Sequence, residues 1–337
     1  MDPLTQTVIG AVAAVAVSRR EERGKAALVG ALAGAFPDVD VLIESAEDPL
    51  LGLQYHRHFT HSLIFVPVVG MLVAMVFSLF PRMRAMGFGR LLLYGVVGAL
   101  THGLLDACTS YGTQLYWPFH GHRESWDVIS IIDPLFTGPL LFALILSLIW
   151  RRINWARGGL LVAVAYLGLG AIQRERAESW ARELAEQRGH PIEKVTARPS
   201  FANQILWRTV YLSEGMYHVD AVSIPPWRAP IHYAGGSVAA FSPEDAAAMV
   251  PSGTVLASDI ERFRHFSQDF LYRWPEDPEI VGDLRYAVMP DSTRPLWGIR
   301  MDTSMPDEHV PIEYFRDVND GDFTRLWRMI LGRPNPS

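Results

Sequence analysis

Cysteine is nearly absent from this chain, because Cys108 is the only one in 337 residues, and this excludes an intrachain disulfide. Basic residues are missing from the start, Met1-Asp2-Pro3, which therefore does not look like a cleaved signal peptide. We expect the first apolar segment to be retained as a helix. An excess of positive charge is also absent, since the formal net charge is −6, and no nucleic-acid partner is evident.

Charged residues are missing from six apolar segments in the first half of the chain, which is 49% hydrophobic overall. A membrane-spanning helix needs roughly 17 to 25 mostly apolar residues. Ser62–Phe80 and Pro134–Trp150 have this length. Leu91–Leu105 and Gly158–Gln173 reach it with flanking polar residues. Pro3–Ser18 and Ala26–Pro37 are short enough to be tilted or only partly inserted.

Lysine and arginine are distributed unevenly among the loops between these segments. They gather after the first, third and fifth segments, whereas residues 38–61 contain only Arg57 and residues 107–130 only Arg123. The positive-inside rule places basic loops in the cytoplasm. It therefore predicts a multi-pass protein in contact with the lipid bilayer. The N-terminus, the two loops with few basic residues and everything after the sixth segment would lie outside.

The chain becomes polar after the sixth segment. The charged stretch from Gln173 is expected to continue the helix until Gly189 and Pro191 stop it. Further on, alternation and turn residues predict strands at residues 203–212, 216–224, 283–289 and 296–301, and helices at 242–249, 258–272 and 323–331.

The predicted fold class is an all-α polytopic membrane helix bundle with a C-terminal soluble α+β domain. Its parts would be a membrane-embedded helical domain at residues 1–175, a helical connector at 176–191 and an extracytoplasmic α+β domain at 192–337.

Five groups of acids and histidines fall at the same, outer end of the predicted membrane helices. Ionisable groups at membrane depth are costly and are usually functional. Carboxylates and imidazoles are also the side chains that bind zinc and related metals. The groups are Asp38 with Asp40, His56 with His58 and His61, His102 with Asp106, His120 with His122, and Asp133.

His102 and Asp106 are four residues apart, so a helix places both on one face, with the spacing of a metal-binding pair. Asp38 and Asp40 follow Pro37, which ends a helix and lets both acids turn toward a site. Each pair also has a simpler explanation. The histidine could be satisfied by its neighbouring carboxylate, and the two acids could begin an ordinary polar loop.

The segment from His56 to Ser62 places three histidines before a membrane helix, and neutral imidazole is the commonest metal ligand. Arg57 in the same segment could hold an anionic group such as phosphate. The segment could instead be a polar cap at the membrane interface. His120 and His122 fit ligands or a solvated loop, and Asp133 fits a ligand or a helix N-cap equally well.

Three linked motifs resemble the YdjM-type family of inner-membrane proteins, which are predicted metal-dependent hydrolases. They are Pro37-Asp38-x-Asp40, His56-Arg57-x-Phe59-Thr60-His61-Ser62 and His102-x-x-x-Asp106, within roughly residues 1–150. The resemblance implies a bacterial inner-membrane location. The family pattern usually has glycine where this chain has His58, which favours His56 and His61 as ligands over His58.

The order of the motifs is more distantly similar to zinc-dependent phospholipase C and the S1/P1 nuclease group. That similarity implies a phosphoester or lipid-linked substrate and zinc, with one or two ions rather than three; manganese is an alternative. The metal ligands would be Asp38, Asp40, His56, His61, His102 and Asp106, and the catalytic residues Asp38, Arg57 and Asp106.

The sequence therefore predicts a membrane-bound, metal-dependent hydrolase that acts at the outer membrane–water interface with a metal-activated water. A cation-coupled transporter is one alternative, but it favours ligands near the middle of the membrane on broken helices. A non-catalytic scaffold with a structural metal is the other, and it would have a closed ligand set.

Overall fold

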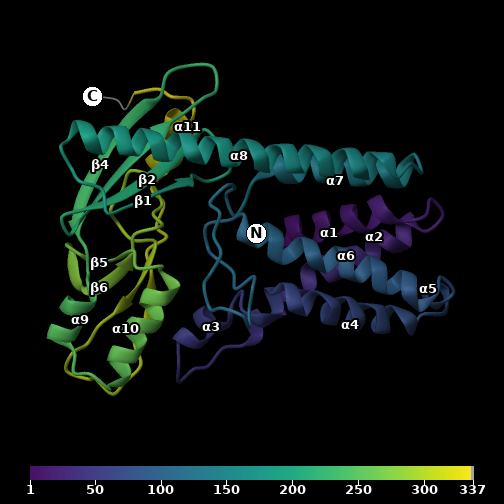
Figure 1. Cartoon of the computed structure of the whole chain (residues 1–337), viewed down its shortest axis with the longest axis horizontal. Helices are drawn as coiled ribbons and strands as arrows, with labels where there is room; N and C mark the ends of the chain where they lie inside the picture. The colour runs from purple at the N-terminus through teal and green to yellow at the C-terminus, as the bar shows by residue number, and fades with distance from the viewer. Residues whose placement is uncertain (335–337) are drawn as a thin grey trace. The chain divides into compact units, whose positions relative to one another are not determined.

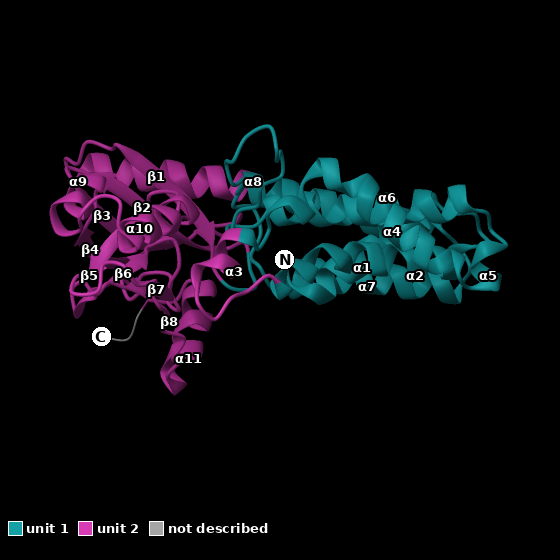
Figure 2. Cartoon of the chain, turned by 90° about the horizontal axis from the view of Figure 1, so that it is seen from below, with its two compact units in different colours: residues 1–42, 55–171, 201–203 teal, residues 43–54, 172–200, 204–337 magenta. Residues whose placement is uncertain are grey.

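The computed structural model describes residues 1–334 and divides into two compact units (Figure 2). Unit 1 comprises residues 1–42, 55–171 and 201–203, and unit 2 comprises residues 43–54, 172–200 and 204–337. Figure 1 shows that unit 1 is built from helices, whereas unit 2 combines helices with sheets. Unit 1 contains all of the residues in the predicted site.

All six apolar segments of unit 1 form helices. The longer elements are α1 (Pro3–Val17), α2 (Arg23–Ala35), α4 (Val66–Ser78), α6 (Phe88–Ala107), α7 (Pro134–Ile149) and α8 (Asn154–Gln187). The short ones are η1 (Phe36–Leu42), α3 (Leu50–Tyr55), η2 (Phe59–His61), η3 (Leu63–Phe65) and α5 (Pro81–Arg84).

Only two of these helices, α6 and α8, are long and apolar enough to cross a membrane, within residues 1–334. A third crossing is possible if the bent pair Leu50–His61 and Leu63–Ser78 forms one span, whereas α1 and α7 are shorter apolar helices. The expected full-length span at Pro134–Trp150 is thus shorter than predicted. Asp133 caps α7 at one end, and Arg151 ends it at the other with a φ of +57°.

The predicted span at Ser62–Phe80 is also not one straight helix. Ser62 is extended, with φ −74° and ψ 151°, and separates η2 from η3 and α4. The two halves of the pair bend by 57°. Pro67 lies in the first turn of α4, where its missing N–H costs no helical hydrogen bond. The bend therefore lies at the start of the predicted span, and His61 lies just before it.

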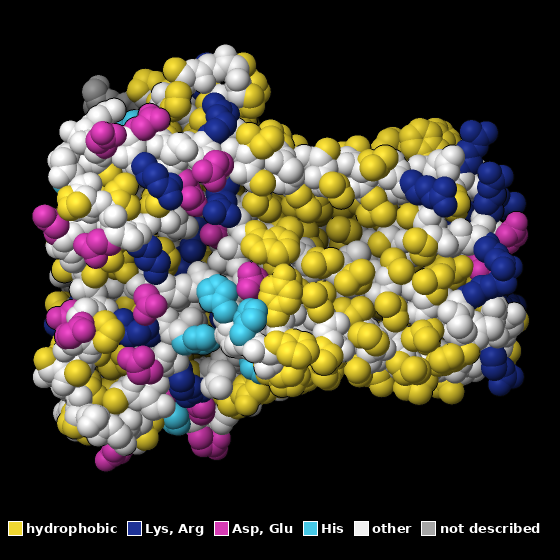
Figure 3. Space-filling view, viewed as in Figure 1, with side chains coloured by type: hydrophobic (Ala, Val, Ile, Leu, Met, Phe, Trp, Pro, Cys, Tyr) yellow, Lys and Arg dark blue, Asp and Glu magenta, His cyan; other side chains and the backbone are white. Residues whose placement is uncertain are grey.

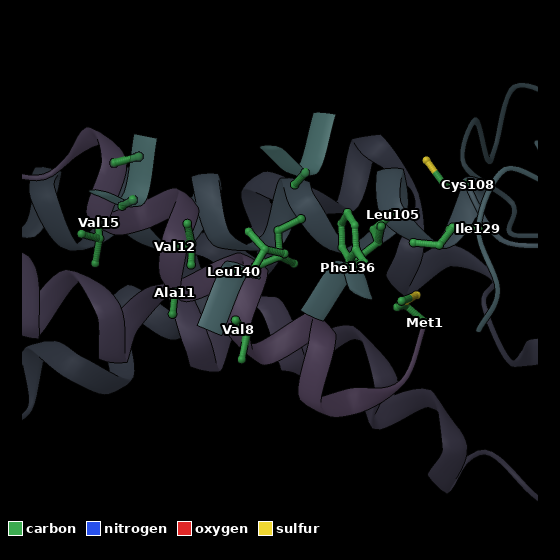
Figure 4. Packing of buried hydrophobic residues seen from close by; sticks show 14 of the residues in the cluster. Met1, Val8, Ala11, Val12, Val15, Leu105, Cys108, Ile129, Phe136 and Leu140 are labelled. Carbon is green, nitrogen blue, oxygen red and sulfur yellow. The ribbon is translucent and has the colours of Figure 1, made fainter. Parts of the chain in front are cut away.

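The short helix α1 lies in the core of unit 1, packed against α2, α6 and α7. Its side chains Val8 and Val12 meet Phe136 and Leu140 of α7 in one buried cluster (Figure 4). Close approach of α1 and α2 requires glycine, because a Cβ on Gly10 would lie 2.4 Å from the Gly30 carbonyl oxygen. The core thus surrounds α1 with protein, although its sequence looks like a lipid-facing helix.

The surface of unit 1 has two distinct regions. Apolar side chains cover the sides of its helices, whereas lysine and arginine gather at the end that carries α5 and the α1–α2 and α7–α8 turns (Figure 3). Leu79, Leu161 and Val164 are among the exposed apolar side chains. An apolar surface with a cationic end is typical of a helix bundle placed in a membrane.

Unit 2 contains two four-stranded antiparallel sheets, in the orders β1-β2-β3-β4 and β5-β6-β7-β8. The first has β1 (Lys194–Pro199), β2 (Leu206–Ser213), β3 (Met216–Ser223) and β4 (Ile231–Ala239). The second has β5 (Leu271–Trp274), β6 (Asp277–Asp283), β7 (Trp297–Arg300) and β8 (Ile312–Tyr314).

The predicted hairpin of β2 and β3 is confirmed. Glu214 and Gly215 form its two-residue turn with φ values of +50° and +73°, which match the right-handed twist of the strands. The strand predicted at 283–289 is wrong, because β6 ends at Asp283, where a buried Asp283–Arg285 ion pair forms.

The helices of unit 2 are α9 (Pro243–Met249), α10 (Val255–Phe266) and α11 (Asp320–Ile330), together with the polar half of α8. Ser242 caps α9 as expected, with Asp245 as the partner in its capping box. The helix predicted at 258–272 ends early, at Phe266, and its last residues form β5. The charged continuation of the sixth segment is confirmed as the second half of α8.

Candidate metal centre

Four ligand-type side chains from three separate elements meet in unit 1. Asp38 comes from η1, His61 from η2, and His102 and Asp106 from α6. Each offers one ligand atom, and these atoms lie within 4.8 Å of one another. Because the helical spacing of His102 and Asp106 fixes two of them on one face of α6, the other two need only arrive from neighbouring helix ends.

The distances within this group, hereafter the four-residue centre, suit a small cation. Asp38 Oδ1 lies 3.4 Å from Nε2 of both His61 and His102. Asp106 Oδ2 lies 3.2 Å from His61 Nε2 and 3.4 Å from His102 Nε2. Ligands about 2.0–2.1 Å from a tetrahedral zinc ion stand about 3.3–3.4 Å apart, so these four separations have the size of tetrahedral edges.

The two histidines present the nitrogen that a metal needs. His102 Nδ1 lies 2.6 Å from the Gly34 carbonyl oxygen, which can only accept, so Nδ1 carries the proton. His61 Nδ1 lies 3.2 Å from Asp40 Oδ2. Such partners on Nδ1 are typical of metal-binding histidines, whose Nε2 lone pair then faces the ion.

Polar atoms of the centre are buried without hydrogen bonds. Within residues 1–334, none forms at His61 Nε2, His102 Nε2 or Asp106 Oδ2. Buried polar groups usually find partners, and two carboxylates facing two imidazole nitrogens need positive charge between them. Arg57 and the Met1 amino group supply part of this charge beside Asp106, and the donors of the centre also suit a divalent metal.

Asp40 and His56 lie next to the four-residue centre but not in it. Asp40 Oδ1 is 2.9 Å from His56 Nδ1, and its Oδ2 accepts from the Arg57 backbone N–H at 2.8 Å and from the Thr60 hydroxyl at 3.0 Å. Asp40 therefore connects His61 to the loop before η2. In this arrangement Asp40 contacts the Nδ1 side of His61, away from the Nε2 atom that faces Asp38 and Asp106.

The imidazoles around Asp38 and Asp40 keep both acids ionised. Burial acts to raise the pKa of Asp38, but the His102 and His61 imidazoles that face its carboxylate outweigh burial and hold the pKa well below its usual range. For Asp40, burial is again outweighed, by hydrogen bonds from His56 and His61, and the pKa is likewise lowered. Asp38 is also the accessible member of the centre, with a side chain 23% exposed, compared with at most 1% for the other three.

Arg57 brings a buried positive charge to the edge of the centre. Its Nε lies 3.5 Å from Asp106 Oδ2, and its Nη1 donates to the Thr109 hydroxyl at 2.9 Å. The guanidinium carbon sits 4.8 Å from the centre of the Tyr111 ring. Its backbone has a φ of +60°, a left-handed conformation that only a firmly held segment maintains for a non-glycine residue.

Some residues that shape the centre carry no motif. The Gln6 side chain donates to Asp106 Oδ1 at 2.9 Å. The amino group of Met1 donates to the same oxygen. Gly103 lets η2 approach α6, because a Cβ there would lie 2.2 Å from the His61 carbonyl oxygen. The polar Gln6 inside an apolar helix was a signal in the sequence, whereas nothing distinguished Gly103 from other membrane glycines.

The remaining polar residues predicted at this end lie outside the four-residue centre. His120 and His122 are exposed, with ring centres 6.5 Å apart. His58 packs against the rings of Tyr55 and Trp117. Asp133 is the N-cap of α7, where it accepts from the backbone of residues 135 and 136, and it also accepts from the Tyr166 hydroxyl.

Unit 2 holds a second group that the sequence did not suggest, formed by Asp48, Asp259 and His309. Arg262 donates to both oxygens of Asp48 and to Asp259 at 2.8–3.0 Å. His309 Nδ1 lies 2.9 Å from Asp259 Oδ2. Because a guanidinium already neutralises these acids, the group is an ion-pair network that ties residues distant in sequence.

Comparison with known proteins gives two matches. A family model described as YdjM inner membrane protein matches residues 1–177. The chain is also similar to the inner membrane protein YbcI of Escherichia coli (strain K12), with 31% identity over 145 residues, which cover 41% of this chain and 80% of that protein. No solved structure matches. The matched region contains the whole four-residue centre.

Proposed function

Because the chain belongs to the YdjM inner membrane protein family through residues 1–177, we propose that it is a metal-dependent hydrolase of the inner membrane. The observation that carries the proposal is the convergence of Asp38, His61, His102 and Asp106, with two buried imidazole nitrogens facing two carboxylates. Arg57 and the Met1 amino group offset the charge of Asp106, and a bound cation would offset that of the second acid, Asp38.

The four residues of the centre would hold the metal, and zinc suits their mixed nitrogen and oxygen donors. Because Asp38 is the exposed member, it is the ligand that water would displace, which would give the ion the open position that a catalytic site needs. Asp40 and the Gly34 carbonyl oxygen orient the two imidazoles through Nδ1. When bound, a divalent metal lowers the pKa of water and so supplies a nucleophile near neutral pH. A second ion would need further ligands, and Asp40 and His56 are the nearest candidates.

The positions of Asp38 and Arg57 suggest their roles in the proposed reaction. Asp38 reaches solvent, so its carboxylate is the group that takes a proton from the attacking water. Arg57 stabilises negative charge that develops on a phosphoryl oxygen next to Asp106. Phosphoester or lipid-linked substrates fit best, since the centre lies at the helix ends, at the depth where lipid headgroups meet water.

The orientation in the membrane is part of the proposal. Lysine and arginine gather at the end of unit 1 that carries α5, which would lie in the cytoplasm. The ends of α2 and α6 that carry the centre would then lie on the outer side. In this arrangement α1, α2 and α7 complete a multi-pass bundle around the two long apolar helices.

Metal analysis of the detergent-purified chain tests the proposal. We expect near-stoichiometric zinc in the wild type and in His122→Ala, whose exposed histidine is the matched control, and loss of zinc in His102→Ala. The same three proteins would then be assayed with phospholipids and a phosphodiester. Hydrolysis should follow the metal, present in wild type and His122→Ala alone.

Other outcomes point to other functions. Equal trace metal in all three proteins, after loading with zinc and manganese, would contradict the metal centre. Bound metal that His102→Ala removes, with no hydrolysis and with uptake of the ion into sealed vesicles, would instead favour a transporter. Bound metal whose removal unfolds the chain, again without hydrolysis, would favour a structural site.

A further inference from the structure

Helix α11 has more apolar residues than its contact with the core of unit 2 can bury. Met329, Leu326 and Ile330 face the core of unit 2, where they pack with Leu206 and Tyr233. A helix that covers a core normally turns polar residues outward.

The outward face of α11 is also apolar. Phe323, Trp327 and Leu331 follow one another at four-residue spacing and are 67%, 58% and 41% exposed. Residues at this spacing lie on one face of a helix, so together they form an exposed stripe.

A second exposed tryptophan lies next to this stripe. Trp227, in the loop between β3 and β4, is 76% exposed. Its neighbour Arg228 donates from Nη2 to the Leu331 carbonyl oxygen at 2.5 Å. Tyr233 of β4 donates to the carbonyl oxygens of Met329 and Arg333 at 3.2 and 3.0 Å. The loop and the end of α11 are therefore held together, and we call Trp227, Phe323, Trp327 and Leu331 the aromatic foot.

Hydrogen bonds connect the loop that carries Trp227 to the end of the apolar part of α8. Gln173 closes the uncharged stretch of that helix, and Arg174 follows it. The buried Gln173 side chain donates to the carbonyl oxygens of Gln204 and Ile224 at 3.0 and 2.8 Å. Ile224 directly precedes the loop with Trp227, and Ile172, Ile224 and Pro230 line one hollow. The loop thus sits at the level where α8 leaves an apolar environment.

We propose that the aromatic foot is a membrane-interface anchor, which rests on the lipid headgroups around α8. Tryptophan is enriched at this depth because its ring is apolar and its N–H is polar. A helix with an apolar outward stripe lies in the plane of the interface. Within unit 2, Figure 2 shows α11 running across the direction of the second half of α8.

The charges around the foot fit lipid as its occupant. Arg228 and Arg333 flank the end of α11 nearest the loop, and Arg328 lies within its last turn. Cationic side chains beside a shallow apolar helix attract anionic lipid headgroups. The acids of α11, Asp320 and Asp322, lie in its first turn, so the positive charge is concentrated at the opposite end, beside Trp227 and Leu331. The proposal requires α8 to cross the membrane, but it does not depend on the metal centre or on hydrolysis.

Spin-label accessibility in the reconstituted full-length chain tests this proposal. Trp327→Cys and Phe323→Cys would each carry a nitroxide in phosphatidylethanolamine–phosphatidylglycerol vesicles, with collisions measured against oxygen and a water-soluble nickel chelate. Glu276→Cys, in the exposed β5–β6 turn, is the aqueous control. The wild type, taken through the same labelling, measures any background from the buried Cys108.

We expect the oxygen-to-nickel collision ratio to be severalfold higher at both foot positions than at the control, because oxygen concentrates in lipid and the chelate does not. Nickel collisions equal to those of Glu276→Cys would place the foot in water and overturn the proposal. Protection from both reagents would also overturn it, since that result means contact with protein, and dipolar broadening between labels would then identify a second copy of the chain.

Discussion

At the scale of single residues, the partner of each Nδ1 atom decides what the opposite nitrogen can do. His102 is fixed by a backbone carbonyl and His61 by a carboxylate. The sequence predicted His102 and Asp106 as a pair because four-residue spacing is a local property of helices. It could not separate Asp40, which orients His61, from Asp38, which faces both histidines, because that difference depends on how η1 meets η2.

Replacing Asp40 by asparagine should weaken metal binding without abolishing it. The neutral amide could no longer compensate a positive charge on His61, and losing such an orienting carboxylate costs about 10- to 100-fold in metal affinity. Competition with a chromogenic chelator would measure the zinc dissociation constant. The same measurement on Asp38→Asn should give a larger loss, and an equal or smaller one would contradict the distinction between the two acids.

Replacing Gly103 by alanine should disturb the centre through its backbone. The new Cβ would lie 2.2 Å from the His61 carbonyl oxygen, so η2 must move or α6 must tilt. Overpacking of this kind costs about 1–3 kcal/mol in the free energy of unfolding. Thermal unfolding in detergent and zinc content would both be measured.

Gly89→Ala is the control within the same helix, because nothing lies within 4 Å of its added Cβ. It should be neutral or stabilise α6 by up to about 1 kcal/mol, through higher helix propensity. If both variants behaved alike, the close contact between Gly103 and His61 would have no importance.

At the scale of elements, the periodicity of apolar residues predicted where the helices lie, but it did not predict where they are interrupted or where they end. The charge-free run at Ser62–Phe80 predicted one span, and its helical part is shorter, because Ser62 is extended and α4 ends at Ser78. The predicted helix at 258–272 ran past the true end of α10, because the apolar residues that continued its pattern, Phe270, Leu271 and Tyr272, are buried in a turn and in β5. The sequence did not predict β1, β4, β6 or β8, and it placed the start of β5 in that helix.

Gln173 should be needed for the junction between α8 and the first sheet. Alanine at this position removes the side-chain donor to the carbonyl oxygens of Gln204 and Ile224, although Gln204 still accepts from the Trp207 indole. Losing a buried donor of this kind costs about 1–3 kcal/mol. Hydrogen–deuterium exchange should show faster exchange in the peptide that covers residues 204–230. Gln187→Ala, at the exposed end of the same helix, should leave that peptide unchanged. Unchanged exchange in Gln173→Ala would show that other contacts hold the junction.

At the scale of the whole molecule, charge distribution carried more information than segment length. The lengths of α1 and α7 leave their crossing of the bilayer open, whereas lysine and arginine gather at the end of unit 1 that carries α5, with Arg57 and Arg123 as the exceptions. The two-unit organisation follows from composition, since apolar segments end at Gln173. The inner arrangement of unit 2 could not be predicted, because it depends on pairings between strands distant in sequence.

Impermeant thiol labelling in intact cells should separate the two sides of the protein. With the outer membrane permeabilised, Glu276→Cys should react with a charged maleimide, whereas Arg84→Cys at the cationic end should react only after the inner membrane is opened. Both positions are exposed on their own units, so local burial cannot explain a difference. The reverse pattern would invert the proposed orientation and place the centre in the cytoplasm.

The carbonyl of Gly34 has a consequence for the environment of this protein. Gly34 accepts from His102 and also leaves no room for a Cβ against the Gln6 carbonyl oxygen of α1, while the Gln6 side chain reaches Asp106. In the proposed metal centre, the spacing of the α1 and α2 backbones would set how the ligands lie around the ion. Lateral pressure in the bilayer, which presses these helices together, would then act on the affinity for the ion. A change of acyl chain length or headgroup should therefore change the measured zinc affinity without any change in the ligands.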